Sequence, residues 1–215
     1  MKHFVYSLIT LLQVGFLCNA AQVGFNKVGY VTNVPNNSSS YYSLAVQPDG
    51  KIVAVGWTDG NPSNGLIARF NTDGSLDQTL NAPHGFINTE GVTDSFAYNS
   101  VALQPDGKIV AVGWTDGIPS NGLIARFNTD GSLDRTFNGT GFINTEDGTD
   151  SLFYNSVALQ PDGKIVAVGM TDGNDPNGLI ARFLPNGVLD AESNWNLQNF
   201  RESNNINKIS IGLLG

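Results

Sequence analysis

The ten-residue stretch QPDGKIVAVG occurs three times without a change, at residues 47–56, 104–113 and 160–169. The copies begin 57 and then 56 residues apart. A second stretch, GLIARF, follows each copy at the same steps, at residues 65–70, 122–127 and 178–183. Self-similarity at a fixed period of this size is typical of one supersecondary unit stacked several times. The repeat therefore predicts the fold class before any single residue is considered.

Each unit contains four short runs that are rich in β-branched and aromatic residues, and none shows sustained helical spacing. In the second unit the runs are residues 85–89, 98–104, 108–115 and 123–127. Short runs of this kind, separated by turn residues, indicate β-strands. The IVAV run inside the third of them has no polar alternation, which predicts a strand covered on both faces. We expect the glycine after each copy of this run to leave room for a neighbouring sheet: Gly56, Gly113 and Gly169.

The turns between these strands have a recognisable chemistry. Residues 105–107 (PDG) suit a three-residue hairpin, in which proline fixes the first central position and glycine takes the left-handed one. Residues 129–131 (TDG) can form the same turn, and the corresponding residues of the third unit are PNG at 185–187. Turn formation therefore accounts for Asp73 and Asp130 better than metal binding does.

Four-stranded sheets stacked face to face, one per unit, are the blades of a β-propeller. We predict an all-β, propeller-like array of three four-stranded blades, an open arc or a partial propeller, without helices outside the leader. The predicted parts are a signal peptide (1–20), three repeats in 21–190 (about 29–84, 85–140 and 141–190) and a divergent C-terminal tail (191–215).

The sequence QPDGKIVAVG followed by LIARFNTDGSLD resembles the delta-60 repeat, a family of β-propeller repeats in predicted secreted and surface proteins of bacteria. The resemblance covers roughly residues 29–190. It implies a propeller and an exported location. It implies no reaction, substrate or catalytic residue.

The first twenty residues have the pattern of a secretion signal, with Lys2, an apolar run at 4–17 and small residues before a cut after Ala20. The apolar run is too short for a membrane span. Cleavage removes Cys18, the only cysteine, and changes the net charge from −8 to −9. An acidic chain repels nucleic acid and anionic membrane surfaces. We expect a secreted or extracytoplasmic protein, in the periplasm or at the cell surface, with neither as a partner.

Three blades are fewer than the four to eight that close a propeller. Three explanations remain open: a truncated gene product, a half-ring that dimerises to six blades, and a tail whose residues 206–214 act as a last strand or cap. Open blade edges also invite self-association. An extracellular glycan or protein is the other partner that the sequence leaves open.

The candidate ligand-binding residues lie after the third strand of each unit: Trp57, Trp114, Asp59, Asp116 and Asp172. Aromatic rings beside carboxylates could stack on sugar rings. The alternative is packing at the end of the blade, and Met170 at the third position favours it because methionine keeps bulk and loses the flat ring.

No cofactor is predicted, although Glu146, Asp147 and Asp150 could bind calcium through carboxylate oxygens. Catalysis by a histidine beside a nucleophile is disfavoured, because His84 lies in a loop whose counterpart in the next unit has no histidine. We interpret the mid-strand arginines as partners of acidic residues rather than an anion-binding ring: Arg69, Arg126 and Arg182.

The sequence therefore predicts an exported, non-catalytic binding or structural module of unknown ligand. A carbohydrate-active propeller enzyme, a remnant of one, or a truncated non-functional product are the alternatives. Two carboxylates could in principle serve as acid and base on a glycoside. The threefold copying of Asp59, Asp116 and Asp172 is better explained by duplication and by the turn preference of Asp-Gly than by acid–base chemistry.

Overall fold

The computed structural model describes residues 30–31, 38–60, 62–89, 95–145, 150–172 and 176–190, which form eleven strands and no helix. Blade 1 consists of β1 (Ser39–Val46), β2 (Ile52–Thr58), β3 (Asn64–Phe70) and β4 (Phe86–Asn88). Blade 2 consists of β5 (Phe96–Leu103), β6 (Ile109–Thr115), β7 (Asn121–Phe127) and β8 (Phe142–Thr145). Blade 3, within the described residues, consists of β9 (Ser151–Leu159), β10 (Ile165–Asp172) and β11 (Gly178–Phe183).

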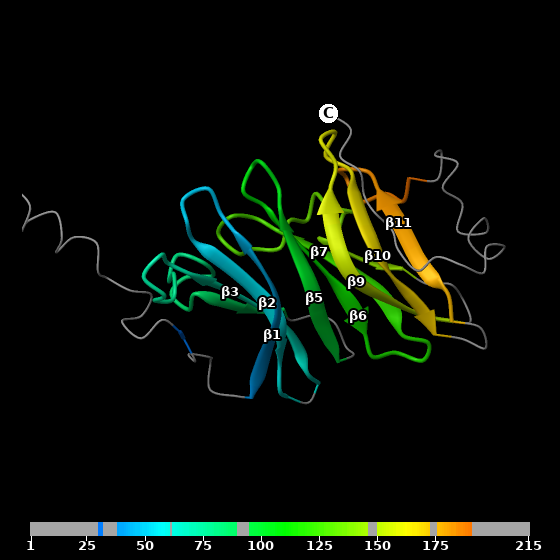
Figure 1. The fold of residues 1–215 in the computed structure, drawn as a ribbon, viewed down its shortest axis with the longest axis horizontal. Helices are drawn as coiled ribbons and strands as arrows, with labels where there is room; N and C mark the ends of the chain where they lie inside the picture. The colour runs from blue at the N-terminus through cyan, green and yellow to red at the C-terminus, as the bar shows by residue number, and fades with distance from the viewer. Residues whose placement is uncertain are drawn as a thin grey trace, which may run out of the picture.

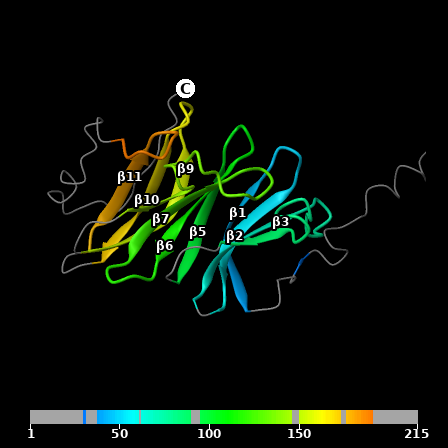
Figure 2. The ribbon, with the colours of Figure 1, turned by 180° about the vertical axis from the view of Figure 1, so that it is seen from behind.

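The three blades stand side by side in chain order, and neighbouring strands within each are antiparallel (Figure 1). Strands β1, β5 and β9 lie next to one another from blade to blade, as the reverse view also shows (Figure 2). The predicted all-β array of propeller blades is confirmed. The predicted signal peptide and C-terminal tail fall outside the described residues.

The sheets are offset by one strand from the sequence units. Strand β4 pairs with β3, and Ile87 lies opposite Ile67. Residues 86–88 therefore complete blade 1 rather than start blade 2. The chain reverses direction after Phe70. The returning segment, β4, then pairs with the edge of β3 that β2 leaves free. The counterpart of this strand in blade 3 would fall within residues 191–215, outside the described part of the chain.

The predicted hairpin turns are confirmed by their glycines. Gly50, Gly107 and Gly163 have φ angles of 82–83° and Gly74, Gly131 and Gly187 have φ angles of 85–91°, all in the left-handed region. The carboxylate of Asp73 accepts a hydrogen bond of 2.9 Å from the backbone N–H of Ser75, and Asp130 does the same for Ser132. Both aspartates therefore stabilise turns, as the sequence predicts.

Gly56, Gly113 and Gly169 were expected to leave room for a neighbouring sheet, and this explanation was wrong. The pairing of β1 with β2 shifts by one residue between Tyr41 and Ser43, which marks a β-bulge opposite Gly56. A Cβ atom at Gly56 would collide with the backbone carbonyl of Ser40 in the same sheet. The glycine is required by the bulge rather than by a neighbouring sheet.

Apolar side chains fill the space between successive blades. One cluster joins Val53, Val55 and Ile67 of blade 1 to side chains of blade 2 that include Tyr98 and Phe127. A second cluster repeats the arrangement one unit later, from blade 2 to blade 3. Strands β2 and β6 are buried on both faces along most of their length, which confirms the prediction from the IVAV runs.

Candidate functional site

A charged cluster recurs in each blade and accounts for its mid-strand arginine. In blade 1 the buried carboxylate of Asp77 accepts hydrogen bonds from Arg69 Nε at 2.6 Å and Lys51 Nζ at 2.9 Å. Burial opposes ionisation of Asp77, but hydrogen bonds from Thr79, Lys51 and Arg69 outweigh it and hold the pKa of this carboxyl well below its usual range. The predicted pairing of Arg69 with an acidic residue is confirmed.

The second and third blades copy this cluster. Asp134 lies 2.7 Å from Arg126 Nε and 2.9 Å from Lys108 Nζ. Asp190 lies 2.9 Å from Arg182 Nε and 3.3 Å from Lys164 Nζ. In each cluster a lysine and an arginine share one carboxylate: Lys51–Arg69–Asp77, Lys108–Arg126–Asp134 and Lys164–Arg182–Asp190.

Two of these arginines also connect one blade to the next. Arg69 Nη1 donates to the carbonyl of Thr129 at 2.7 Å, and Arg126 Nη1 donates to the carbonyl of Pro185 at 2.5 Å. Both acceptors lie in the hairpin turn of the following blade. Since both guanidinium groups are buried and committed to these bonds, they do not offer an anion-binding ring.

The two candidate tryptophans lie at the ends of β2 and β6, half-buried. The ring of Trp114 meets the ring of Phe153 of blade 3 edge-on, with 5.6 Å between centroids. The residue of blade 2 that corresponds to Phe153 is Ala97, which has no ring. Among the described residues, the buried Trp57 Nε1 has no hydrogen-bond acceptor. Trp114 thus takes part in packing between blades.

The candidate carboxylates are exposed, and each lies at or directly after the end of the third predicted strand of its unit. Asp59 accepts a hydrogen bond from the N–H of Gly60 at 3.0 Å, as expected of an Asp-Gly turn. Asp116 follows β6 and Asp172 ends β10. In the described part of the chain, no three His, Cys, Asp or Glu side chains come together in a way that could hold a metal ion.

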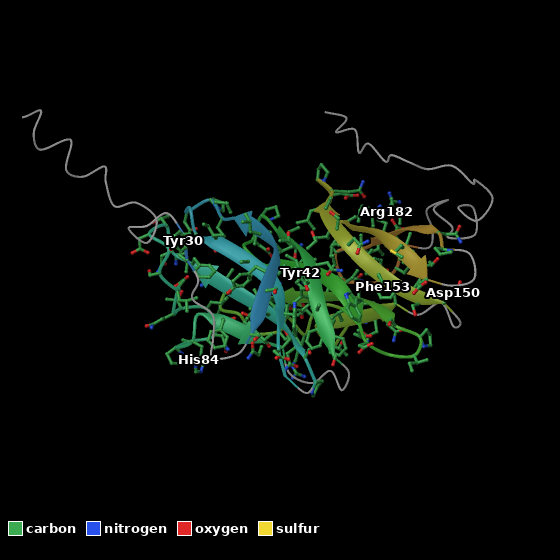
Figure 3. The ribbon with its side chains drawn as sticks, turned by 60° about the horizontal axis from the view of Figure 1, so that its bottom comes forward. Tyr30, Tyr42, His84, Asp150, Phe153 and Arg182 are labelled. Atoms are coloured by element: carbon green, nitrogen blue, oxygen red, sulfur yellow. The ribbon has the colours of Figure 1, made fainter. Side chains whose placement is uncertain are left out.

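The loop residues fall partly outside the described structure. Glu146 and Asp147 of the possible calcium loop are not described, whereas Asp150 lies immediately before β9. His84 is exposed, and its ring lies against Phe86 with 5.9 Å between centroids (Figure 3). No contact joins His84 to a nucleophile among the residues that the structure describes.

An apolar hollow on the open face of blade 1 is the cavity that sequence reasoning missed. Its volume is about 620 Å³. Its lining comes from all three long strands of the blade and from the segment before them: Val31, Tyr41, Tyr42, Ser43, Leu44, Ile52, Ala54 and Phe70. Figure 3 marks Tyr42 on this blade. A hollow of this size and lining is suited to an apolar or aromatic ligand.

Large apolar side chains are left in contact with solvent around this hollow. Leu44 is 62% exposed and Tyr41 is 36% exposed. The Tyr41 ring meets Phe70 edge-on, with 6.1 Å between centroids, and burial raises the pKa of Tyr41 to about 12. The phenol therefore stays neutral at physiological pH. No signal in the sequence marks the site, because Tyr41 and Leu44 have the same apolar character as the corresponding core residues of the next unit, Tyr98 and Val101.

The repeats match a known family model. Residues 47–80, 104–137 and 160–192 each match the family described as "Domain of unknown function (DUF5122) beta-propeller". Each match runs from the QPDG hairpin past the carboxylate of the charged cluster. A comparison with curated proteins gave no match.

Several solved structures resemble the chain at low identity. A protein of unknown function from Dyadobacter fermentans DSM 18053 is 17% identical, with a TM-score of 0.46 over 73% of this chain and 50% of that one. A protein of unknown function from Bacteroides caccae is 13% identical, with a TM-score of 0.42 over 71% and 44%. Virginiamycin B lyase from Staphylococcus aureus is 16% identical, with a TM-score of 0.38 over 71% and 43%.

The chain thus spans half or less of the length of these structures. Within the described residues, no helix is long and apolar enough to cross a membrane. The three antiparallel sheets and the three family matches agree in place and number. The chain is a β-propeller repeat protein, and three of its segments are similar to the DUF5122 β-propeller family.

Proposed function

We propose that the chain is an exported, non-catalytic binding or structural module, and that the hollow on blade 1 is the surface through which it binds. The observation that carries the proposal is the lining of this hollow. Its walls are apolar and aromatic, and Leu44 and Tyr41 project into it while remaining exposed. Contiguous exposed apolar surface is typical of a site that binds a ligand or a protein.

The state of the buried carboxylates supports a non-catalytic role. Proton transfer at neutral pH is most efficient when a group titrates near that pH. Asp77 and Asp134 are held ionised by their lysine and arginine partners, with pKa values well below the usual range. These aspartates therefore stabilise the blades rather than exchange protons with a substrate.

The exported location is supported by the leader pattern in residues 1–20 and by the resemblance to the delta-60 repeat family. Expression of the whole chain with its leader, followed by fractionation and N-terminal sequencing, tests this part. We expect a mature chain that begins at Ala21 outside the cytoplasm. A chain that stays in the cytoplasm with Met1 intact would contradict export.

The binding surface is tested with an apolar fluorescent dye of the anilinonaphthalene type, titrated against a dilute, monomeric chain. We expect dye fluorescence to increase on binding and the increase to be lost in the variant Leu44→Glu, because a carboxylate in the hollow repels an apolar ligand. Ile118→Glu is the matched control, since Ile118 is a fully exposed apolar residue in the loop between β6 and β7. Equal dye binding by both variants would remove the hollow from the proposal.

The enzymatic alternative is tested on a broad panel of polysaccharides, with sugar release as the readout. We expect no turnover, and turnover abolished by replacing Asp59, Asp116 or Asp172 would favour the carbohydrate-active alternative instead. A glycan-binding screen with Trp57→Ala and Trp114→Ala tests sugar stacking. Binding that both replacements abolish would assign these rings to a glycan site.

A further inference from the structure

Five asparagine–glycine pairs occur in the chain, and they differ in how firmly the fold holds them. They lie at residues 64–65, 121–122, 138–139, 177–178 and 186–187. In such a pair the backbone nitrogen of the glycine can attack the side-chain amide of the asparagine, because glycine has no Cβ atom to hinder the approach. The attack requires the peptide plane between the two residues to rotate, so hydrogen bonds that fix this plane prevent it.

Strand pairing holds three of the five pairs. The pairs at 64–65 and 121–122 begin β3 and β7, and both residues of each pair lie opposite residues of the neighbouring strand. At 177–178, Gly178 begins β11 and lies opposite Met170. A paired, extended backbone cannot rotate its peptide planes without breaking hydrogen bonds of the ladder.

The pair at 186–187 is held by its hairpin turn. The N–H of Gly187 donates to the carbonyl of Leu184 at 2.8 Å, and Asn186 Oδ1 accepts from the N–H of Val188 at 3.1 Å. The nitrogen that would attack and the amide that it would attack are therefore both engaged.

The remaining pair, Asn138 and Gly139, lies in an exposed turn that precedes β8. The N–H groups of Thr140 and Gly141 donate to the carbonyl of Phe137 and anchor the turn after the pair. Among the described residues, neither the carbonyl of Asn138 nor the N–H of Gly139 has a hydrogen-bond partner. The peptide plane between the two residues is therefore free to rotate.

The two reacting groups of this pair are also open to solvent. No heavy atom of the described residues lies within 4 Å of a Cβ atom built on Gly139. The Asn138 side chain makes a long hydrogen bond, 3.4 Å from Nδ2 to the carbonyl of Phe142. The attacking nitrogen is thus unobstructed, and the leaving nitrogen is weakly held.

We propose that the chain modifies itself at Asn138. The nitrogen of Gly139 attacks Cγ of Asn138, the new N–Cγ bond closes a succinimide ring, and the Cγ–Nδ2 bond breaks. Nδ2 leaves as ammonia with the proton that the Gly139 nitrogen gives up, relayed by solvent. Water then adds across the imide and opens it to aspartate or to isoaspartate. The inference goes beyond the proposed function and does not depend on the hollow in blade 1.

The equivalent asparagine of blade 1 shows the contribution of the glycine. Asn81 and Asn138 are both exposed and have left-handed φ angles of 47° and 51°. The N–H of Asn81 donates to the carbonyl of Asp130 of the next blade at 2.7 Å, much as Asn138 does to its own next blade. Asn81 is followed by Ala82, whose methyl group hinders the approach of the backbone nitrogen. We therefore expect Asn81 to remain an amide while Asn138 is converted.

The modified residue lies at the boundary between blades 2 and 3. The N–H of Asn138 donates to the carbonyl of Asn186 at 2.8 Å. The residue before Asn186, Pro185, accepts the hydrogen bond of Arg126 across the same boundary. Isoaspartate lengthens the main chain by one methylene beside this contact. It should therefore weaken the attachment of blade 3, whereas aspartate leaves the main chain unchanged.

Peptide mapping by mass spectrometry, during incubation of the folded chain at mildly alkaline pH, tests the proposal. Isoaspartate is detected by its methylation with an isoaspartyl methyltransferase. We expect position 138 to react at least about tenfold faster than Asn81 and the other four pairs, a difference of about 1.4 kcal/mol in activation free energy. The rate should increase with pH, because the attack requires loss of the Gly139 amide proton.

Two outcomes of this experiment would overturn the proposal. Equal rates at position 138 and at the strand-held pairs would mean that the open turn contributes nothing. Aspartate at position 138 without any isoaspartate would point to direct hydrolysis and remove Gly139 as the nucleophile. In urea the rates of the five pairs should converge, and a preference for position 138 that persists there would assign it to local sequence instead of the fold.

Two variants give a matched comparison. Gly139→Ala should slow the reaction at position 138 to the rate of Asn81, and Ala82→Gly should accelerate it at position 81. Gly139 has a φ of 74°, so alanine is strained there. If Gly139→Ala loses the far-ultraviolet spectrum of the folded chain, Ala82→Gly decides alone, and an unchanged rate at position 81 would overturn the proposal.

The effect on the blade boundary is measured by urea unfolding of fresh and incubated chains. We expect a lower midpoint for the chain that carries isoaspartate and an unchanged midpoint for Asn138→Asp, which adds the charge without the methylene. Equal midpoints for the fresh and the modified chain would overturn the effect on the boundary.

Discussion

Replacing a glycine by alanine should have opposite effects at two equivalent positions of this array. A Cβ atom at Gly122 would lie 2.6 Å from Cε2, 2.9 Å from Cδ2 and 3.1 Å from Cζ of Tyr154. At Gly178, the same position one unit later, no heavy atom of the described residues lies within 4 Å. Both glycines lie in equivalent strands, and neither has a left-handed φ angle, so alanine is compatible with the backbone at both.

The magnitude follows from how firmly Tyr154 is held. Its side chain is fully buried, its hydroxyl donates to Thr145 at 3.0 Å, and its ring meets Phe183 edge-on at 6.4 Å. The ring cannot move aside without losing these contacts, so overpacking should cost about 1–3 kcal/mol. Alanine also stabilises by about 0.4–1 kcal/mol through the unfolded chain, but this term is shared by both variants. The free energies of unfolding should therefore differ by about 1–3 kcal/mol, with Gly178→Ala the more stable.

Urea unfolding followed by tyrosine and tryptophan fluorescence measures the difference, at a chain concentration where both variants sediment as monomers. Gly178→Ala should unfold at the same or a higher urea concentration than the unchanged chain, and Gly122→Ala at a lower one. Equal midpoints for the two variants would refute the assignment of the tyrosine–glycine contact as a tight boundary between blades. A Gly122→Ala variant more stable than Gly178→Ala would refute it as well.

Three other predictions follow from the charged clusters and the tryptophans. Asp134→Asn should lower the free energy of unfolding by about 3–5 kcal/mol in urea titrations, because it leaves Arg126 buried without its anion; a loss below about 1 kcal/mol would contradict this role. In the folded chain the pKa values of Asp77 and Asp134 lie below the ordinary carboxyl value of about 3.9. The two groups therefore contribute their full stabilisation above roughly pH 5. This stabilisation is lost as the pH falls toward the folded pKa values. Urea midpoints measured from pH 7 to pH 3 should fall only below roughly pH 5, and less steeply in Asp134→Asn; a fall centred near pH 6.5 would point to a histidine instead. Trp114→Ala should lower the free energy of unfolding by about 0.5–1.5 kcal/mol more than the control Trp57→Ala, because the ring of Trp114 meets the ring of Phe153 edge-on. Thermal unfolding measures the difference, and equal losses of stability in the two variants would argue against that packing.

The repeated part of the fold could be predicted from the sequence because its signals are local. The glycine of each PDG hairpin needs a left-handed backbone, and the IVAV runs need cover on both faces, so residue type and order are sufficient. The partner of Arg69 lies only eight residues away, at Asp77, across one turn. A pairing between residues this close in the sequence can be predicted once the strand and the turn between them are assigned.

The remaining features depend on how strands pair and which blades are neighbours, and the type of a single residue does not determine either. The bulge opposite Gly56 is a matter of register, and register between β1 and β2 is set by the pairing of whole strands. The assignment of residues 86–88 to blade 1 rather than blade 2 depends on which neighbouring strand has free hydrogen-bonding groups. The hollow escaped prediction because Tyr41 and Leu44 have the same apolar character as the buried Tyr98 and Val101, and only the neighbour differs.

The arginine that reaches from each blade into the next hairpin turn has a consequence for how such a chain can change length. Blade 2 supplies both the guanidinium of Arg126 for the boundary ahead of it and the turn carbonyl of Thr129 for the boundary behind it. Duplication or loss of one whole unit therefore leaves each remaining boundary with the same donor and the same acceptor. The number of blades can grow or shrink by recombination between identical segments without any new contact having to be selected.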